Sequence, residues 1–360
     1  MSVLNDLDNI RALDPGNMYN AIFDLPEQMA AALEIGRKWR TSADDFADIK
    51  NIVAVGMGGS AIGADLIRSY LSTVLLVPFQ VCRHYSLPEY VDDETLVIVS
   101  SYSGNTEETL SAVDDAISRK SMIAAVSTGG MLQEVAEIND IPLAIIPSGL
   151  QPRAALGHSF VPVLVFLEKI GLIKNVAEEI TAMIEKLKEF RDGLIEDQPV
   201  KMNLAKQLAE KMHGKIPIIY TGPALTDVVG IRWKGQICEN SKILAFANQF
   251  PEFNHNELVG WSEPIEEHKE NLVVLMLRDT EDHHQIRQRM NFVRDMLQAR
   301  EVDVIEIHSK GETALQRTFQ LIQLGDFVSY YLAILNEEDP TPVAVIEDLK
   351  KFLSGKVAPV

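Results

Sequence analysis

The sequence predicts an α/β protein made of two similar units, each a parallel β-sheet with helices on both faces. Three observations support this fold class. Short β-branched runs alternate with amphipathic segments from residue 51 onward. The alternation gives way to a charged, helical stretch at 176–212 and then restarts. The restarted pattern follows the first at an offset of about 165 to 180 residues, which indicates two degenerate copies of one unit.

The first copy follows a helix predicted at 26–40 from its apolar periodicity. Its predicted strands are the short apolar runs at 51–55, 79–83, 96–101, 122–127 and 142–147. Its predicted helices follow the strands, with the clearest at 61–71, 106–119 and 157–171. Because parallel strands need long connections, the order β-α-β-β-α-β-α-β predicts a parallel sheet.

In the second copy, PIIYTG at 217–222 resembles NIVAVG at the start of the first. Further strands are predicted at 271–277 and 302–308, and helices at 226–240 and 315–335. A proline-marked break and a short helix end the chain. The predicted boundaries are a helical segment at 1–45, a first domain at 46–175, a helical connector at 176–212, a second domain at 213–336 and a tail at 337–360.

Composition and charge limit the function classes. The chain has 360 residues, 46% hydrophobic and 24% charged, and no apolar run long enough for a membrane span. It lacks a secretory signal pattern and has two cysteines far apart in sequence, so we expect a cytoplasmic protein with free thiols. A net charge of −19 argues against nucleic-acid binding. A small anion could still bind at helix N-termini with a few basic residues.

The segment VAVGMGGSAIG (53–63) is a glycine-rich turn between a predicted strand and a predicted helix. Taken alone it matches a loose dinucleotide-binding pattern. That pattern expects a carboxylate at the end of the next strand to bind the ribose, but Arg83 stands there, which would suit only a 2′-phosphate. The matching turn of the second copy, TGPALTDVVG, lacks the paired glycines and the serine. We therefore expect only the first copy to bind a ligand.

A second polar turn, SYSGNTEET (101–109), follows the neighbouring strand. Its hydroxyl groups stand beside the free backbone N–H groups of a helix start, which is a neutral site for an anion. A helix-capping role for Thr106 alone would be the simpler interpretation. Two serine-bearing turns at the same sheet edge instead favour a single phosphate group.

GMGGSAIG, SYSGNTEET and the doubled unit resemble the sugar isomerase (SIS) fold, a flavodoxin-like α/β fold that binds phosphosugars. The segments ENSK (239–242) and PEFNHNE (251–257) are similar to those of the bifunctional phosphoglucose/phosphomannose isomerases, and the resemblance covers nearly the whole chain. It implies an aldose–ketose isomerase that interconverts glucose 6-phosphate, and mannose 6-phosphate, with fructose 6-phosphate.

The resemblance also implies the roles of individual residues. Phosphate-binding residues would be Gly59, Ser60, Ser101, Ser103 and Thr106. Glu239 would be the catalytic base, and His255, supplied by the partner subunit of a homodimer, would open the sugar ring. Arg153 and Lys310 would complete the catalytic set.

The reaction itself asks for such groups. A carboxylate can carry the proton between C1 and C2, a histidine suits ring opening near neutral pH, and a cation can stabilise the enediolate. The expected chemistry needs no metal and no cofactor. From sequence alone, Glu239 could instead be a solvated helix-end carboxylate, His255 a structural histidine and Lys310 an ordinary lysine before a helix.

Three other functions would use parts of this pattern. A non-catalytic phosphosugar sensor would not need the Glu239, His255 and Lys310 set, and such sensors carry a basic DNA-binding segment. The isomerase part of a glucosamine 6-phosphate synthase would be joined to an amidotransferase domain. A dinucleotide-dependent enzyme would not need the second serine-bearing turn.

Overall fold

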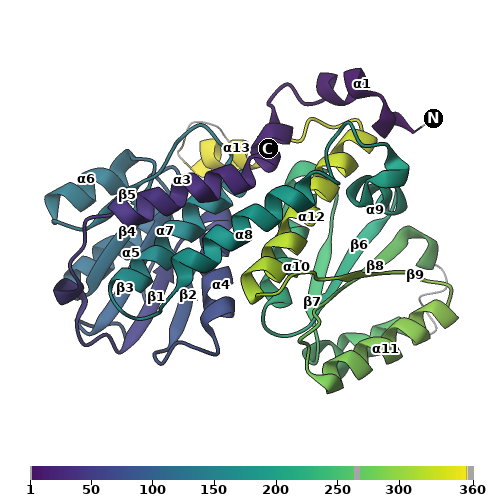
Figure 1. Ribbon diagram of the computed structural model, residues 1–360. Helices are drawn as coiled ribbons and strands as arrows, with labels where there is room; N and C mark the ends of the chain where they lie inside the picture. The colour runs from purple at the N-terminus through teal and green to yellow at the C-terminus, as the bar shows by residue number, and fades with distance from the viewer. Residues whose placement is uncertain (1, 263–267, 354, 356–360) are drawn as a thin grey trace.

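The computed structural model describes residues 2–262, 268–353 and 355, so the last residues of the predicted tail (354 and 356–360) lie outside the described part. Two parallel sheets lie toward opposite ends of the molecule, with helices between and around them (Figure 1). The prediction of two α/β units is confirmed. Within the described residues, no helix has the length and apolar character needed to cross a membrane.

The first sheet has five strands in the order β2-β1-β3-β4-β5, all parallel. Their bounds are β1 (Asn51–Val55), β2 (Phe79–Cys82), β3 (Thr95–Ser101), β4 (Met122–Ser127) and β5 (Leu143–Ile145). This is the flavodoxin-like strand order, in which the carboxyl ends of β1 and β3 flank the switch point where ligands bind. The pairing of Val55 with Val99 brings these two ends to the same level.

Helices cover both faces of this sheet because its strand residues are apolar on both sides. Ile52 and Ile98 pack into the core shared with α4 (Gly58–Leu71) and α7 (Leu156–Lys169). Val53 and Val97 face the opposite way, into the core covered by helices that follow β3 and β4. Those helices are α5 (Glu107–Ser118) and α6 (Gly130–Ile138).

The second sheet has the order β7-β6-β8-β9, again parallel, which repeats the first four positions of the first sheet. Its strands are β6 (Ile216–Thr221), β7 (Phe246–Gln249), β8 (Leu272–Arg278) and β9 (Asp303–His308). The edge strand β7 was not predicted from the sequence. Its residues, FANQ, include no β-branched side chain and give a weak strand signal.

The remaining helices surround and join the two sheets. Their bounds are α1 (Leu7–Ala12), α2 (Met18–Phe23), α3 (Leu25–Lys38), α8 (Val176–Arg191), α9 (Leu204–Met212), α10 (Thr226–Asn240), α11 (His284–Ala299), α12 (Ala314–Leu335) and α13 (Ala344–Leu353). Figure 1 shows α10 and α12 between the sheets. Residues 315–334 of α12 are all buried, and one hydrophobic core runs through both halves of the chain. The two units are therefore held together by shared packing.

Candidate active site

The first serine-bearing turn places Ser60 in the first turn of α4, directly after β1. Ser60 is buried, and its Oγ accepts a hydrogen bond from the backbone N–H of Tyr102 at 3.1 Å. Tyr102 is the first residue after β3, so this bond ties the two predicted phosphate turns together. No side chain caps the N-terminus of α4, which leaves its first N–H groups available to an anion.

The second turn follows β3 and begins α5. Ser101 Oγ and Thr106 Oγ1 lie 3.1 Å apart, and the N–H of Asn105 donates to Ser103 Oγ at 3.3 Å. Thr106 stands at the N-cap position of α5 but makes no capping hydrogen bond. Thr106 therefore begins the helix without capping it through its side chain, and the first N–H groups of α5 also lack a side-chain partner. Gly104 enables the bend with a φ of +68°.

Gly59 brings the first turn against the segment that carries Arg153. A Cβ at Gly59 would lie 2.6 Å from the carbonyl oxygen of Pro152 and 2.9 Å from the backbone nitrogen of Arg153. Only glycine permits this approach. The 3-10 helix Pro152–Ala154 thus lies beside the phosphate turns, and the structure brings all five predicted phosphate residues and Arg153 into one region.

Arg153 connects this region to the second half of the chain. Its Nη1 lies 3.4 Å from Oε2 of Glu239, the penultimate residue of α10. Its Nε donates to Oδ1 of the buried Asn240 at 2.6 Å. The side chain of Arg153 is 3% exposed and that of Glu239 is 34% exposed, so the carboxylate can be reached from solvent while the guanidinium is held behind it.

The electrostatics of the pair follow from burial. Burial lowers the pKa of the Arg153 guanidinium, and the carboxylate of Glu239 opposes that change. Arginine keeps its proton in proteins, so the group remains a cation. A second cation, Lys242, donates to the carbonyl oxygen of Glu239 at 2.6 Å, and burial lowers its pKa as well.

Asn240 and Lys242 are site residues that the sequence analysis missed. Both lie in the ENSK segment, which carries part of the family resemblance. Their position in the sequence did not predict a contact with Arg153, which is 87 positions from Asn240. The carbonyl oxygens of Pro340 and Thr341 also accept from Arg153, at 2.7 and 2.8 Å. No local sequence pattern indicates that these distant segments meet.

His255 and Lys310 lie elsewhere in the chain. His255 ends a 3-10 helix after β7, and Lys310 follows β9, so both are exposed at the carboxyl edge of the second sheet. Glu239 lies in the last turn of α10, which leads back to the amino end of β7. The 15 residues of α10 span about 22 Å, and within the described residues neither side chain contacts Glu239. One chain alone therefore does not assemble the four predicted catalytic residues.

The corresponding turn of the second half is filled by a carboxylate. A Cβ at Gly222, directly after β6, would lie 3.1 Å from Cγ of Asp282 and closer still to its Oδ1. Asp282 is buried, and burial raises its pKa. An acidic side chain at this position disfavours a phosphate, which agrees with the expectation that only the first copy binds one.

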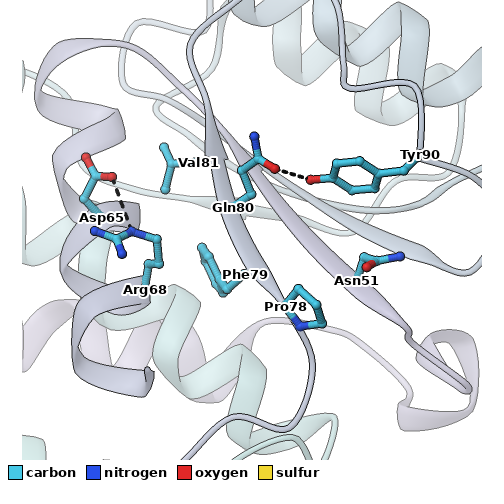
Figure 2. Close-up of a pocket in the computed structure, with 8 residues that line it drawn as sticks. All are labelled: Asn51, Asp65, Arg68, Pro78, Phe79, Gln80, Val81 and Tyr90. Carbon is cyan, nitrogen blue, oxygen red and sulfur yellow. Dashed lines mark hydrogen bonds and ion pairs between the residues drawn. The ribbon is translucent and has the colours of Figure 1, made fainter. Parts of the chain in front are cut away.

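A separate surface pocket of about 560 Å³ lies along the edge strand β2 (Figure 2). Its lining includes Asp65 and Arg68 from α4 and Gln80 from β2, whose amide oxygen accepts from the hydroxyl of Tyr90 at 2.5 Å. It contains none of the predicted site residues. The phosphate turns lie instead at the carboxyl ends of β1 and β3.

Comparison with known proteins places this geometry in a family. Residues 201–353 match the family model for the bacterial phospho-glucose isomerase C-terminal SIS domain. The bifunctional phosphoglucose/phosphomannose isomerase of Caldicellulosiruptor bescii is 46% identical over 94% of this chain and 99% of its own length. The enzyme of that name from Aquifex aeolicus is 37% identical over 88% of this chain and 94% of its own.

The fold is shared more widely. The structure of tagatose-6-phosphate ketose/aldose isomerase from Escherichia coli superposes with a TM-score of 0.72 at 15% identity, and the match covers 91% of this chain and 95% of that one. At that identity the likeness shows the fold alone. The sequence relatives go further: this chain belongs to the bifunctional phosphoglucose/phosphomannose isomerase family.

Proposed function

We propose that this protein is an aldose–ketose isomerase that interconverts glucose 6-phosphate and mannose 6-phosphate with fructose 6-phosphate. The carrying observation is the Arg153–Glu239 pair, with its partly exposed carboxylate, beside two helix N-termini that no side chain caps. The names of the relatives support the same substrates. In this proposal residues 46–175 hold the phosphate and residues 213–336 supply the base.

The phosphate would bind at the starts of α4 and α5. Gly59, Ser60, Ser101, Ser103 and Thr106 offer backbone N–H groups and hydroxyls there, and the helix dipoles favour a negative charge. The protein as a whole carries a charge of −19, so a local site of this kind is needed to hold an anion.

At the reacting carbons, Glu239 would remove the proton from C2 of the open-chain aldose and return it to C1. Proton transfer by one carboxylate on one face of the sugar forms an enediolate between the two steps. Arg153 lies 3.4 Å from this carboxylate and provides the positive charge that stabilises the enediolate oxygen.

We further propose a homodimer in which His255 reaches the partner's active site and opens the sugar ring. His255 is exposed, and within the described residues it makes no hydrogen bond or ion pair with Glu239 of its own chain. Lys310 lies at the same edge of the second sheet, so a role for it in the site would also need the second subunit. The free cysteines Cys82 and Cys238 favour a cytoplasmic location.

The alternative is a phosphosugar sensor without catalytic activity. It would use the phosphate turns in the same way, but it would give no reason for a carboxylate held beside a buried arginine. The Arg153–Glu239 pair therefore distinguishes the isomerase from the sensor, whereas the phosphate site is common to both.

The test is the variant Glu239→Gln, which keeps the size of the side chain and removes the base. We expect kcat to fall by about 10² to 10⁴ for each of the two aldose phosphates, assayed separately by formation of fructose 6-phosphate. Binding of the phosphosugars, measured by calorimetry, should persist because the phosphate turns are untouched.

The matched control is Glu210→Gln on the exposed face of α9, which should keep full activity. Full activity in Glu239→Gln would exclude Glu239 as the base. Binding without turnover in the unmodified protein would favour the sensor.

A further inference from the structure

The segment that follows α12 crosses directly over Arg153. We call residues 338–341 the C-terminal strap. Its carbonyl oxygens at Pro340 and Thr341 accept hydrogen bonds from Nη2 of Arg153 at 2.7 and 2.8 Å. Nζ of Lys242 also lies 3.4 Å from the Pro340 oxygen. The backbone of the strap thus contacts two cations of the site, the buried Arg153 and the half-buried Lys242.

The hydrogen bonds of Arg153 show what the strap does. A guanidinium has five N–H donors in a fixed plane. Nε–H is used by Asn240 at 2.6 Å, and both strap oxygens bind Nη2. The remaining edge, Nη1, faces Glu239. The strap therefore fixes the rotation of the guanidinium so that its unshared edge points toward the base.

We propose that the C-terminal strap is a positioning element of the active site: it orients Arg153 for the enediolate step. This inference rests on the proposed isomerase function and adds a requirement to it. The strap touches Arg153 and not the phosphate turns, so its displacement should slow turnover and leave substrate binding largely intact.

The strap packs closely against Gly16 of the N-terminal segment. A Cβ at Gly16 would lie 2.5 Å from Cβ and 2.7 Å from Cγ2 of Thr341, and closer still to Oγ1. All three nearest atoms belong to the Thr341 side chain. Within the strap, Oδ1 of Asp339 accepts a hydrogen bond from the N–H of Thr341 at 2.8 Å, which fixes its local turn. The strap cannot keep its position if Gly16 acquires a side chain.

The experiment tests the contact between Gly16 and Thr341 with two complementary substitutions. In Gly16→Ala the new methyl group displaces Thr341, and we expect kcat to fall about ten- to a hundredfold because a small misplacement of a catalytic group has that effect. KM should stay within about twofold. The double variant Gly16→Ala with Thr341→Gly removes the overlapping atoms but keeps the carbonyl groups, so it should recover most of kcat.

The matched control is Gly193→Ala in the loop after α8, where a Cβ would meet nothing closer than 3.6 Å and kcat should not change. An unchanged kcat in Gly16→Ala, or a loss that Thr341→Gly does not restore, overturns the proposal. A chain ending at Glu337 tests it without the added methyl group: full kcat with an unchanged melting temperature overturns it, and a lower kcat supports it. Absence of isomerase activity in the unmodified protein would contradict the proposed function itself.

Discussion

Several charged and polar residues of this protein are buried. Arg153 is almost fully buried, and desolvation of a cation is costly unless hydrogen bonds replace its hydration. Asn240 and two strap carbonyls provide that replacement. The arrangement keeps the planar guanidinium of Arg153 in a fixed position beside Glu239.

His158, on α7 five residues after Arg153, is buried without such hydrogen bonds in the described part of the chain. It is 4% exposed, and its Nδ1 has no hydrogen-bond partner within the described residues. Burial lowers the pKa of His158 to about 4. The folded protein therefore holds a neutral imidazole here, whereas the unfolded chain takes up a proton near pH 6.5.

This difference predicts acid sensitivity. Between pH 6.5 and about 4 the unfolded state binds one more proton at His158 than the folded state, so stability falls as pH falls through this range. We expect His158 to account for a loss of about 2 kcal/mol in the free energy of unfolding between pH 7 and pH 5. Urea titration at both pH values checks this.

The variant His158→Phe removes the titration and serves as the comparison. Its free energy of unfolding should change less between the two pH values than that of the parent, by about the same 2 kcal/mol. Equal changes in the two proteins would contradict the assignment to His158.

At the level of elements, α10 and α12 are joined by buried polar groups as well as by packing. Arg232 Nη2 lies 2.6 Å from Oδ2 of Asp326, and Gln236 donates to the other oxygen at 2.9 Å. Burial raises the pKa of Asp326, and Arg232 opposes that change. Arg232 also donates to the carbonyl oxygen of Arg153 at 3.0 Å. The helix pair thus fixes the backbone at Arg153, while the strap fixes its side chain.

Breaking this pair should be strongly destabilising. Asp326→Asn leaves the Arg232 cation buried without its counter-charge, and we expect a loss of about 3 to 5 kcal/mol in the free energy of unfolding. Replacing both partners by apolar residues, Arg232→Met with Asp326→Leu, should recover most of that loss. Denaturant titration of the single and double variants measures both values.

An exposed pair on α8 gives the comparison. Lys186 and Glu189 are 2.9 Å apart with both side chains more than half exposed, so Glu189→Gln should cost less than about 1 kcal/mol. A similarly small effect of Asp326→Asn would contradict the role given to the buried pair.

Most elements could be predicted from the sequence because their apolar patterns are local. Strands such as 51–55 and 96–101 are short buried runs, and the glycine-rich turn after the first one marks its end. The strand β7 was not predicted because FANQ lacks β-branched residues and forms only an edge strand. Strand signals in a sequence depend on the residues within a short window, and the four residues of β7 give little such signal.

The candidate site was less predictable, since its parts come from distant segments. The two phosphate turns were found together because consecutive strands of a parallel sheet end at one edge. Contacts of Arg153 with Asn240 and with residues 340–341 span 87 and 187–188 positions, and no local pattern encodes them. Family resemblance identified the roles proposed for Glu239 and His255, but it did not indicate what holds Arg153 in place.

At the scale of the whole molecule, the separation of His255 from Glu239 predicts subunit complementation. If each site takes Glu239 from one chain and His255 from the other, a mixed dimer of Glu239→Gln and His255→Ala chains contains one intact site. Random re-association of two inactive variants should then restore roughly a quarter of the parental activity.

The measurement is kcat after unfolding and refolding the two variants together, with each variant refolded alone as the control. Light scattering gives the oligomeric state of the same samples. No recovery of activity in mixed dimers would contradict the shared site.

The side chain of Asp282 beside Gly222 bears on how many phosphosugars one chain can bind. The strand order is repeated in both halves, so the scaffold offers two switch points per chain. One of them is already filled by the buried side chain of Asp282. We therefore expect a chain with two similar folds to bind one phosphosugar, while its second half carries Glu239, the proposed base.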